Sequence, residues 1–294
     1  MIQGKVLVTG ATGDTGGYAI DRLLEQGREV RALAHAKDER SEKLRGRGVE
    51  VVYGDLLDFG QVRAALGGVK RAYFVYPIRP GILQATAYFA QAAKEVGVDG
   101  IVNMSQKSAR EDAKSHAATD HWLSERVFDW LGLNVAHIRP TYFAEWLIYV
   151  APMIRAGLLH VPFGTGKHAP IAAEDQGRVI AGLLEDPAAH NGKIYPLFGP
   201  VEYTYEETAR VLGRVLGKDV RYKQVDFEEF SRTLQASGKN AGRENSFLFQ
   251  HLREVAIDHQ NGIFAGTNDL VEKLGGRPPM TLEAFIEKHR AAFV

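Results

Sequence analysis

The sequence predicts an α/β fold: a doubly wound parallel sheet followed by a smaller, mostly helical C-terminal lobe. Three observations support this fold class. Six short apolar runs alternate with helical patterns before Pro140, the runs are continuously apolar, and a glycine-rich loop joins the first run to the first helix. Continuously apolar strands are typical of a parallel sheet that helices cover on both faces. Right-handed crossovers then give the doubly wound arrangement.

The first half of the chain supplies the predicted sheet. Each strand is a short run of mainly apolar residues, and each helix has apolar residues at helical spacing. Gly27 fits the end of the first helix, and Pro140 stops the sixth strand. The expected strands are 5–9, 29–34, 49–53, 71–75, 100–103 and 134–139, and the expected helices are 18–26, 38–47, 59–66, 82–96 and 119–131.

After Pro140 the alternation loosens. Glycine and proline punctuate residues 157–170, and the last third of the chain is mostly helical in pattern. We interpret residues 1–150 as the sheet lobe and residues 151–294 as a smaller, mixed lobe interleaved with the sheet. Its expected elements are strands 194–198 and 220–225, and helices 205–216, 228–236, 244–261, 268–274 and 282–292.

Composition narrows the class of protein. The 294 residues are 45% hydrophobic and 24% charged, close to a soluble globular average. Because 36 basic residues balance 36 acidic ones, no net field attracts a polyanion, which argues against a dedicated nucleic-acid binder. The chain has no cysteine, which excludes disulfides, thiolate nucleophiles and cysteine-ligated metals.

The sequence also bears on location. Gly4 and Gly10 interrupt the N-terminus before a signal-peptide apolar core of about 7–15 residues can form. No apolar run approaches the roughly 20 residues that span a bilayer. We therefore expect a cytoplasmic protein that does not enter a membrane.

The strongest motif is the glycine loop, residues 9–17. Gly10 permits a tight exit from the strand, Gly13 permits close approach to a pyrophosphate, and Gly16 permits close helix packing. The helix N-terminus adds free N–H groups and a partial positive charge. A turn without a ligand is the alternative, but the strand-loop-helix context predicts a dinucleotide site formed by Gly10, Thr12, Gly13, Asp14, Thr15 and Gly16.

The second strand bears on the choice of dinucleotide. NAD sites usually place a carboxylate there for the adenosine ribose, whereas this strand is followed by His35 and Lys37. These side chains suit a 2′-phosphate, so the sequence favours NADP(H) over NAD(H). If both are simply solvated, either cofactor fits.

Two further pairs follow strands and are expected at the same edge of the sheet. Asp55 and Leu56 would border the adenine, and Tyr76 and Pro77 would wall the cofactor cleft.

Further motifs follow one another along nearly the whole chain. They are Thr9-Gly10-Ala11-Thr12-Gly13-x-x-Gly16, Gly54-Asp55-Leu56, Gly132-Leu133, Ile138-Arg139-Pro140, Phe143, Pro162-Phe163-Gly164-x-Gly166-Lys167-x-Ala169-Pro170-Ile171-Ala172, Gly199-Pro200, Gly262-Ile263-Phe264 and Gly276-Arg277-Pro278. With these motifs the sequence resembles the NmrA-like branch of the atypical short-chain dehydrogenases/reductases.

The resemblance implies a Rossmann lobe that binds NAD(P)(H), residues 1–150, and a substrate-binding lobe, residues 151–294, that closes the cleft. Some members of the family reduce quinones, azo or triphenylmethane dyes, or plant benzylic ethers. Others bind the cofactor and regulate a partner according to redox state.

The catalytic pattern departs from typical short-chain dehydrogenases, which carry Tyr-x-x-x-Lys after the fifth strand. Residues 115–129 contain no tyrosine, and His121 stands where ether-reductase relatives carry lysine and the family's quinone reductases carry histidine. His121 lies off the apolar stripe of Leu123, Val127, Trp130 and Leu131, so it faces either solvent or the cleft. Ser105 follows the fifth strand, near where related reductases place a serine over the nicotinamide, although it also fits a loop hydroxyl. We name His121 and Ser105 as catalytic and cofactor-site candidates.

Aromatic residues follow the sixth strand. Tyr142 and Phe143 are expected at the cofactor site, and with Trp146 they could wall a flat acceptor, although single aromatics are more often core. Helix 244–261 could form a lid or an interaction surface.

Charged residues near these motifs are given structural interpretations. Arg139-Pro140 is read as a strand-ending pair, and Glu174 and Asp175 as helix-capping charges.

Three functions remain in competition. The first is NAD(P)H-dependent hydride delivery to a quinone-like or dye-like acceptor, because such acceptors are electrophilic without a Tyr-Lys proton donor. The second is a non-enzymatic redox sensor, and the third is a tailoring enzyme acting on a polycyclic aromatic substrate. The expected partner is a small aromatic or quinone-like molecule, with a homodimer or protein partner left open. The histidines show no metal-ligand spacing, so no metal is expected.

Overall fold

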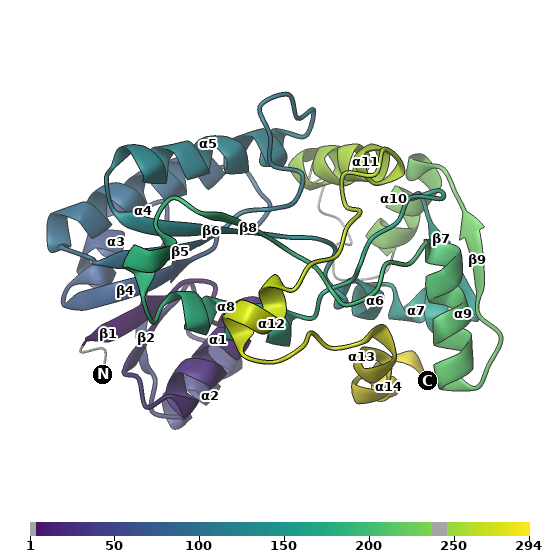
Figure 1. Ribbon diagram of the computed structural model, residues 1–294, viewed down its shortest axis with the longest axis horizontal. Coiled ribbons are helices and arrows are strands. Elements are labelled where there is room, and N and C mark those ends of the chain that lie inside the picture. Colours follow the sequence, from purple (N-terminus) through teal and green to yellow (C-terminus); the bar gives the residue numbers. More distant parts are fainter. Residues whose placement is uncertain (1–3, 237–245) are drawn as a thin grey trace.

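The computed structural model describes residues 4–236 and 246–294. Its centre is a seven-stranded parallel sheet of order β3-β2-β1-β4-β5-β6-β8 (Figure 1), which confirms the doubly wound α/β fold. The strands are β1 (Lys5–Val8), β2 (Val30–Ala34), β3 (Glu50–Tyr53), β4 (Val69–Phe74), β5 (Gly100–Met104), β6 (Asn134–Pro140) and β8 (Ile194–Leu197).

Helices cover both faces of the sheet. Successive residues of β1 pack against helices on opposite faces of the sheet. Val6 and Val8 pack toward α1 and α8, whereas Leu7 packs toward α3 and α4. One layer contains α1 (Asp14–Glu25), α2 (Glu39–Gly46), α8 (Ala173–Leu183) and α12 (Leu270–Gly275). The other contains α3 (Phe59–Leu66), α4 (Ile82–Val96) and α5 (His116–Trp130).

A second hydrophobic core lies beyond the carboxyl ends of the strands, on the right of Figure 1. A short parallel pair of strands belongs to it, β7 (Leu158–Val161) with β9 (Arg221–Gln224). Its helices are α6 (Trp146–Tyr149), α7 (Ala151–Arg155), α9 (Tyr205–Leu216), α10 (Phe227–Ala236), α11 (Ser246–Gln260), α13 (Leu282–Lys288) and α14 (Arg290–Phe293). A 3₁₀ turn, η1 (Pro187–His190), precedes β8.

The chain crosses between the two bodies more than once. Although β8 and α8 follow residue 150, β8 pairs with β6 and α8 packs against α1. We retain the division into residues 1–150 and 151–294 as our proposal, with these two elements of the second part completing the sheet.

Several expectations need correction. The sheet has a seventh strand, β8, and the interval expected to be only glycine- and proline-punctuated contains β7. Trp130, expected on the apolar stripe of its helix, is 74% exposed because it is the last residue of α5. Asp175 lies in the first turn of α8, as expected of a charge at a helix N-terminus, but it is also buried, pairs with Arg178 and accepts from the Met280 N–H at 2.7 Å. Residues 244 and 245 of the expected helix lie outside the described residues.

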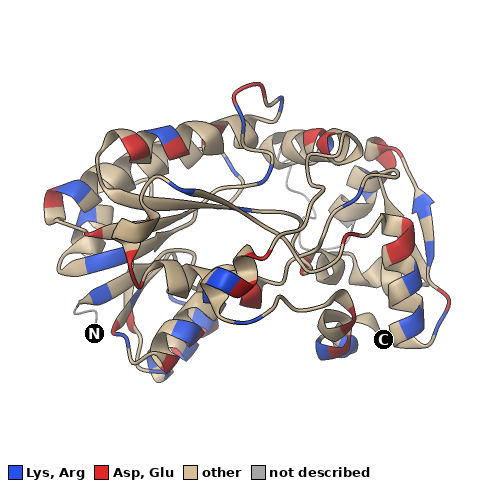
Figure 2. Cartoon of the chain, in the orientation of Figure 1, with Lys and Arg blue, Asp and Glu red and all other residues tan. Residues whose placement is uncertain are grey.

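Charge is distributed over both bodies. Lysine, arginine, aspartate and glutamate occur together on the helices of each (Figure 2), as the balanced composition leads one to expect. Among residues 4–236 and 246–294, no helix combines the length and apolarity required to span a bilayer.

Candidate functional site

The glycine loop makes the tight turn that its sequence predicts. Gly10 has φ +56°, and a Cβ there would lie 2.5 Å from Cγ1 of Val75. A Cβ at Gly16 would lie 2.3 Å from the carbonyl oxygen of Gly10. The left-handed turn and the close packing of α1 on the loop therefore both require glycine.

The loop leaves the start of α1 open to an anion. Gly13 is the N-cap residue and provides no side-chain cap, so the first N–H groups of the helix lack that partner. Gly13 and Asp14 are exposed and Thr12 is half-buried, whereas the hydroxyl of Thr15 lies 2.9 Å from that of buried Tyr73. The hydroxyl of Thr15 thus already has a protein partner, while its backbone N–H lies in the first turn of α1. This uncapped helix N-terminus beside a tight glycine turn fits a dinucleotide pyrophosphate.

The residues predicted around the adenosine lie at the same edge of the sheet. His35 and Lys37 follow β2 and are exposed. Asp55, after β3, is partly buried, and its Oδ1 accepts from the Leu57 N–H at 2.9 Å. Leu56 is also partly buried. The structure thus brings these four residues to the carboxyl ends of adjacent strands.

An apolar cavity of about 410 Å³ opens beyond β4, β5 and β6. It joins these strand ends to α5, α6 and α11. Most of the predicted cleft residues line it, and several of its lining residues were not singled out in the sequence. The lining comprises Val75, Tyr76, Pro77, Ile78, Met104, Ser105, Gln106, His121, Pro140, Thr141, Tyr142, Phe143, Trp146, Tyr149, Leu248, His251, Leu252, Val255 and Phe264.

His121 faces this cavity rather than solvent. Its side chain is buried at 4% exposure. Burial lowers its pKa to about 4, with a further lowering from nearby His251 and an opposing effect of Glu125. The imidazole is therefore neutral near pH 7 and can donate or accept one hydrogen bond, but it holds no second proton to give up.

His251 on α11 is a second cavity histidine, on the helix that the sequence analysis considered as a lid but without a role of its own. Its Nδ1 lies 2.8 Å from the hydroxyl of Ser115, which also accepts from the Ala118 N–H at 3.2 Å and so caps α5. Burial lowers the pKa of His251 to about 4. Helical spacing alone did not reveal which face of α11 meets the cavity.

Three residues that line the cavity have a buried polar atom without a partner among the described residues. These atoms are Oγ of Ser105, Nε2 of Gln106 and the hydroxyl of Tyr142. Because buried polar atoms in folded proteins are nearly always hydrogen-bonded, these atoms are suited to a polar group of a ligand.

Tyr142 lines the cavity but packs its ring into the second core. Its ring centroid lies 5.2 Å from that of Phe163, 5.0 Å from that of His168 and 4.7 Å from that of Phe264. Burial raises the pKa of its hydroxyl well above the ordinary value. Tyr142 therefore forms a fixed part of the cavity wall. The aromatic faces that remain available to a ligand are those of partly buried Phe143 and Trp146.

Glu145 lies between the apolar cavity and the predicted nucleotide site at the glycine loop. The sequence analysis did not predict a role for it. Its Oε1 accepts from the Ala173 N–H at 3.0 Å, at the start of α8. Burial raises its pKa to about 7, against an opposing effect of that hydrogen bond, and nearby Asp14 and Asp175 contribute in the same direction as burial. Glu145 is thus a capping carboxyl close to the first turn of α1.

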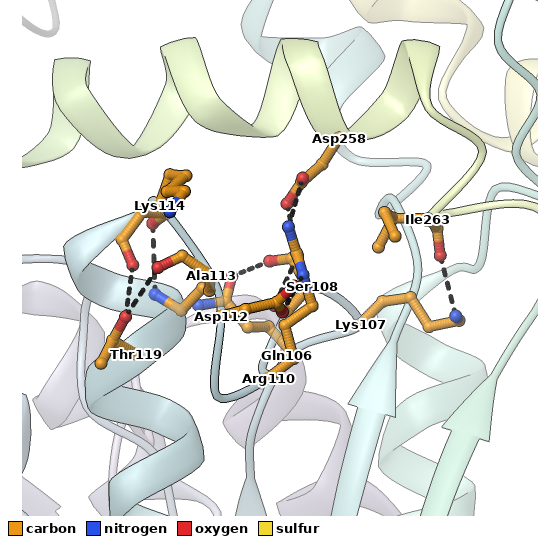
Figure 3. A network of polar contacts seen from close by, with 12 residues as sticks. Gln106, Lys107, Ser108, Arg110, Asp112, Ala113, Lys114, Thr119, Asp258 and Ile263 are labelled. Carbon is orange, nitrogen blue, oxygen red and sulfur yellow. Dashed lines mark hydrogen bonds and ion pairs between the residues drawn. The ribbon is translucent and has the colours of Figure 1, made fainter.

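The loop after β5 holds α11 over the cavity (Figure 3). The Arg110 guanidinium reaches Asp258 on α11, and the Lys107 ammonium donates to the Ile263 carbonyl at 2.8 Å. On the other side, Arg139 forms a pair with fully buried Glu125, as expected of a structural residue. Of the two roles considered for helix 244–261, the geometry of α11 is that of a cover on the cavity.

Within the described ranges, no three histidine, aspartate or glutamate side chains gather in a way that could hold a metal ion. The arrangement is that of a Rossmann-type nucleotide-binding protein with an apolar ligand cleft at the carboxyl ends of its strands. The sequence model of the NmrA-like family matches residues 3–286, and the chain belongs to this family.

Known relatives agree with this assignment. The NAD(P)H azoreductase of Xenophilus azovorans is 30% identical over 291 residues, covering 98% of this chain and 99% of the relative. The NADPH complex of an Escherichia coli NADPH-dependent quinone oxidoreductase superposes with a TM-score of 0.84 at 24% identity, covering 97% of this chain and 99% of the other. NmrA, a negative transcriptional regulator solved with NADP, has a TM-score of 0.82 at 17% identity, covering 99% and 98% of the two chains. At these identities the two structures establish the fold, and the reductase names among the relatives agree with the expected enzyme class.

Proposed function

We propose that this protein is an NAD(P)H-dependent reductase that delivers hydride to a flat, activated acceptor of the quinone or dye kind. One observation carries the proposal: two residues that line the apolar cavity also contact the glycine loop. Val75 lines the cavity and contacts the loop, because its backbone N–H donates to Oγ1 of Thr9 at 2.8 Å. Tyr149 lines the cavity and donates from its hydroxyl to Oδ2 of Asp14 at 3.3 Å.

The residues present fit such a cofactor. Gly10, Gly13, Gly16 and the N-terminus of α1 would hold the pyrophosphate, and Asp55 with Leu56 would border the adenine. His35 and Lys37 support our preference for NADP(H) over NAD(H). When bound, the nicotinamide supplies two electrons and a proton as hydride.

The chain's own contribution is then orientation and exclusion of water. Phe143 and Trp146 can align a planar ring, and the unpartnered Ser105 hydroxyl and Gln106 amide can donate to an acceptor oxygen. Reduction of a quinone to a hydroquinone needs one further proton, which neutral His121 at pH 7 relays from solvent rather than stores. These groups support reduction of an activated acceptor without a Tyr-Lys pair as proton donor.

The test is steady-state NADPH oxidation against a panel of p-quinones, azo dyes and triphenylmethane dyes, under anaerobic conditions. We expect turnover with at least one of these classes and none with simple alcohols or unactivated ketones. Turnover confined to ketones would overturn the proposal.

A second candidate is a redox sensor for a protein partner, supported by the similarity in fold to a transcriptional regulator over 99% of this chain. A sensor must bind the oxidised and reduced cofactor with different affinity, because a ligand shifts an equilibrium only through differential binding. Titration with NADP⁺ and NADPH would test this candidate, and equal dissociation constants would exclude it.

A further inference from the structure

A second cavity adjoins the acceptor cavity. It has a volume of about 400 Å³ and is bounded by α6, α7, α10, α11 and the C-terminal helix. Both cavities share Trp146, Tyr149, Leu248 and Leu252. The remaining lining of the second cavity is Ile148, Ala151, Pro152, Arg155, Leu234, Phe249 and Ala292.

The partition between the cavities consists of side chains from two helices. Trp146 and Tyr149 lie on α6 with ring centroids 5.7 Å apart, edge to face, and the two leucines lie one turn apart on α11. Trp146 is only partly buried and Tyr149 is 46% exposed. A ligand that stands against Trp146 in the first cavity therefore contacts a side chain that also lines the second.

Both cavities have mainly apolar linings, and they differ in the unpartnered polar groups that a ligand would meet. Its lining contains one charged residue, Arg155, whose Nη1 already donates to the Ala292 carbonyl at 2.7 Å. The hydroxyl of Tyr149 is directed to Asp14 of the glycine loop. By contrast, the unpartnered polar atoms of Ser105 and Gln106 lie in the first cavity. A polar ring oxygen thus fits the first cavity and a hydrocarbon group fits the second.

We propose that the second cavity binds an unbranched aliphatic tail of the acceptor, so that the substrate class is a quinone or comparable flat ring carrying an alkyl chain. This inference rests on the proposed reductase function and specifies its substrate. Transfer of methylene groups from water into an apolar cavity favours binding by about fourfold for each methylene. The gain should stop when the cavity is full.

The experiment compares 2,3-dimethoxy-5-methyl-1,4-benzoquinone with its 6-butyl and 6-decyl derivatives. For the native protein we expect KM to fall at least tenfold from the tail-less to the decyl compound. Ile148→Trp, which fills the second cavity, should bring this KM ratio close to one. Ile194→Trp, on exposed β8 away from both cavities, is the matched control and should keep the native ratio. A native ratio near one, or an unchanged ratio in the Ile148 variant, would overturn the inference.

A binding measurement separates this inference from the reductase proposal. Isothermal titration of the NADP⁺-loaded protein with the same three quinones gives dissociation constants without turnover. Affinity that depends on the tail, without NADPH oxidation, would support the tail site and contradict the reductase function. NADPH oxidation with an affinity that does not depend on the tail would support the reductase function and contradict the tail site. Phe249→Ala enlarges the cavity and should extend the affinity gain to longer tails, which provides a second test if the tryptophan variant folds poorly.

Discussion

The Arg110 guanidinium donates two hydrogen bonds to the Asp258 carboxylate, from Nη1 to Oδ2 at 2.8 Å and from Nη2 to Oδ1 at 2.7 Å (Figure 3). Asp258 is 6% exposed, and the pair joins the loop after β5 to α11. Since Ser105 lies at the start of that loop and His251 lies on that helix, the pair fixes the two sides of the acceptor cavity relative to each other.

Replacing Arg110 should therefore loosen the cover of the cavity. Arg110→Ala leaves a buried carboxylate unpaired, and we expect a free energy of unfolding lower by roughly 1–3 kcal/mol. KM for the acceptor should rise more than the dissociation constant of NADPH. Arg214→Ala removes an exposed pair with Glu283 and serves as the control. Equal effects of the two variants on acceptor KM would contradict the positioning role of Arg110.

Gly13→Val should abolish cofactor binding while the protein stays folded. The residue is exposed, and its Cβ would lie 3.2 Å from the Gly10 carbonyl oxygen, so the added atoms would occupy the space offered to a pyrophosphate. Fluorescence titration with NADPH measures the affinity, and circular dichroism measures the fold. Gly17→Ala is the control, because a Cβ at Gly17 meets nothing within 4 Å. Undiminished NADPH affinity in the Gly13 variant would refute the phosphate-loop assignment.

Lys37→Ala should weaken binding of NADPH by about tenfold, as expected for loss of one charge-assisted contact, and should leave NADH affinity unchanged. Competitive titration with the two cofactors provides the ratio. Lys43→Ala, on the exposed face of α2 where it pairs with Glu39, is the matched control. If the affinity of the variant for NADPH and for NADH falls equally, Lys37 does not contact the 2′-phosphate.

His121→Gln should lower kcat by about 10–100-fold, the range of a modest general acid–base contribution, with little change in NADPH affinity. Glutamine keeps a hydrogen-bonding group but cannot relay a proton. His116→Gln changes an exposed histidine at the start of the same helix and controls for the substitution. A native rate in the His121 variant would remove this residue from the chemistry.

Buried histidines should make stability depend on pH. Burial lowers the pKa of His121, His251 and His259 to about 4, from an ordinary 6.5. Because each folded-state pKa is depressed, the unfolded chain binds more protons between these values. The histidine contribution to the free energy of unfolding should therefore be level above pH 6.5 and decrease as the pH drops from 6.5 toward 4.

Thermal unfolding at a series of pH values tests this dependence. His259→Gln should flatten the slope of Tm against pH, whatever its effect on Tm itself. Comparison with the native protein isolates the histidine, since Glu145, whose pKa burial raises to about 7, acts with the opposite sign in both proteins. An unchanged slope would contradict a neutral buried His259.

Where local signals agreed with tertiary structure, the sequence was a sufficient guide to the fold. Helix α4 begins and ends as predicted, because Gly81 and Gly97 adopt left-handed conformations at its two ends. Helix α3 likewise has the expected bounds, with the Asp58 side chain accepting from the Gln61 N–H at its start.

Elements defined by distant partners were harder to predict. Strand β7 is short and pairs with β9, far along the chain, so nothing local distinguishes it from the surrounding loop. The exposure of Trp130 depends on where α5 ends relative to its neighbours, which periodicity does not specify.

The candidate site divides in the same way. The glycine loop could be predicted because its backbone geometry is local: the left-handed turn at Gly10 and the packing of Gly16 on the Gly10 carbonyl both lie within one motif. Only part of the cavity lining could be predicted from the sequence. Ser105 directly follows β5, where ligands are expected, and His121 was singled out on α5 by its place in the family pattern, whereas His251 and Leu252 enter from a helix whose docking the sequence did not specify.

The central claim is that NADPH bound at the glycine loop is oxidised by an acceptor in the adjoining cavity. The most direct measurement is an anaerobic single-turnover experiment, in which protein loaded with one equivalent of NADPH is mixed with a p-quinone and the nicotinamide absorbance is followed. Our account predicts loss of that absorbance with an equal yield of hydroquinone, at a rate that saturates with quinone and falls in the His121→Gln variant. Tight binding of NADPH with no oxidation by quinones or dyes would contradict it.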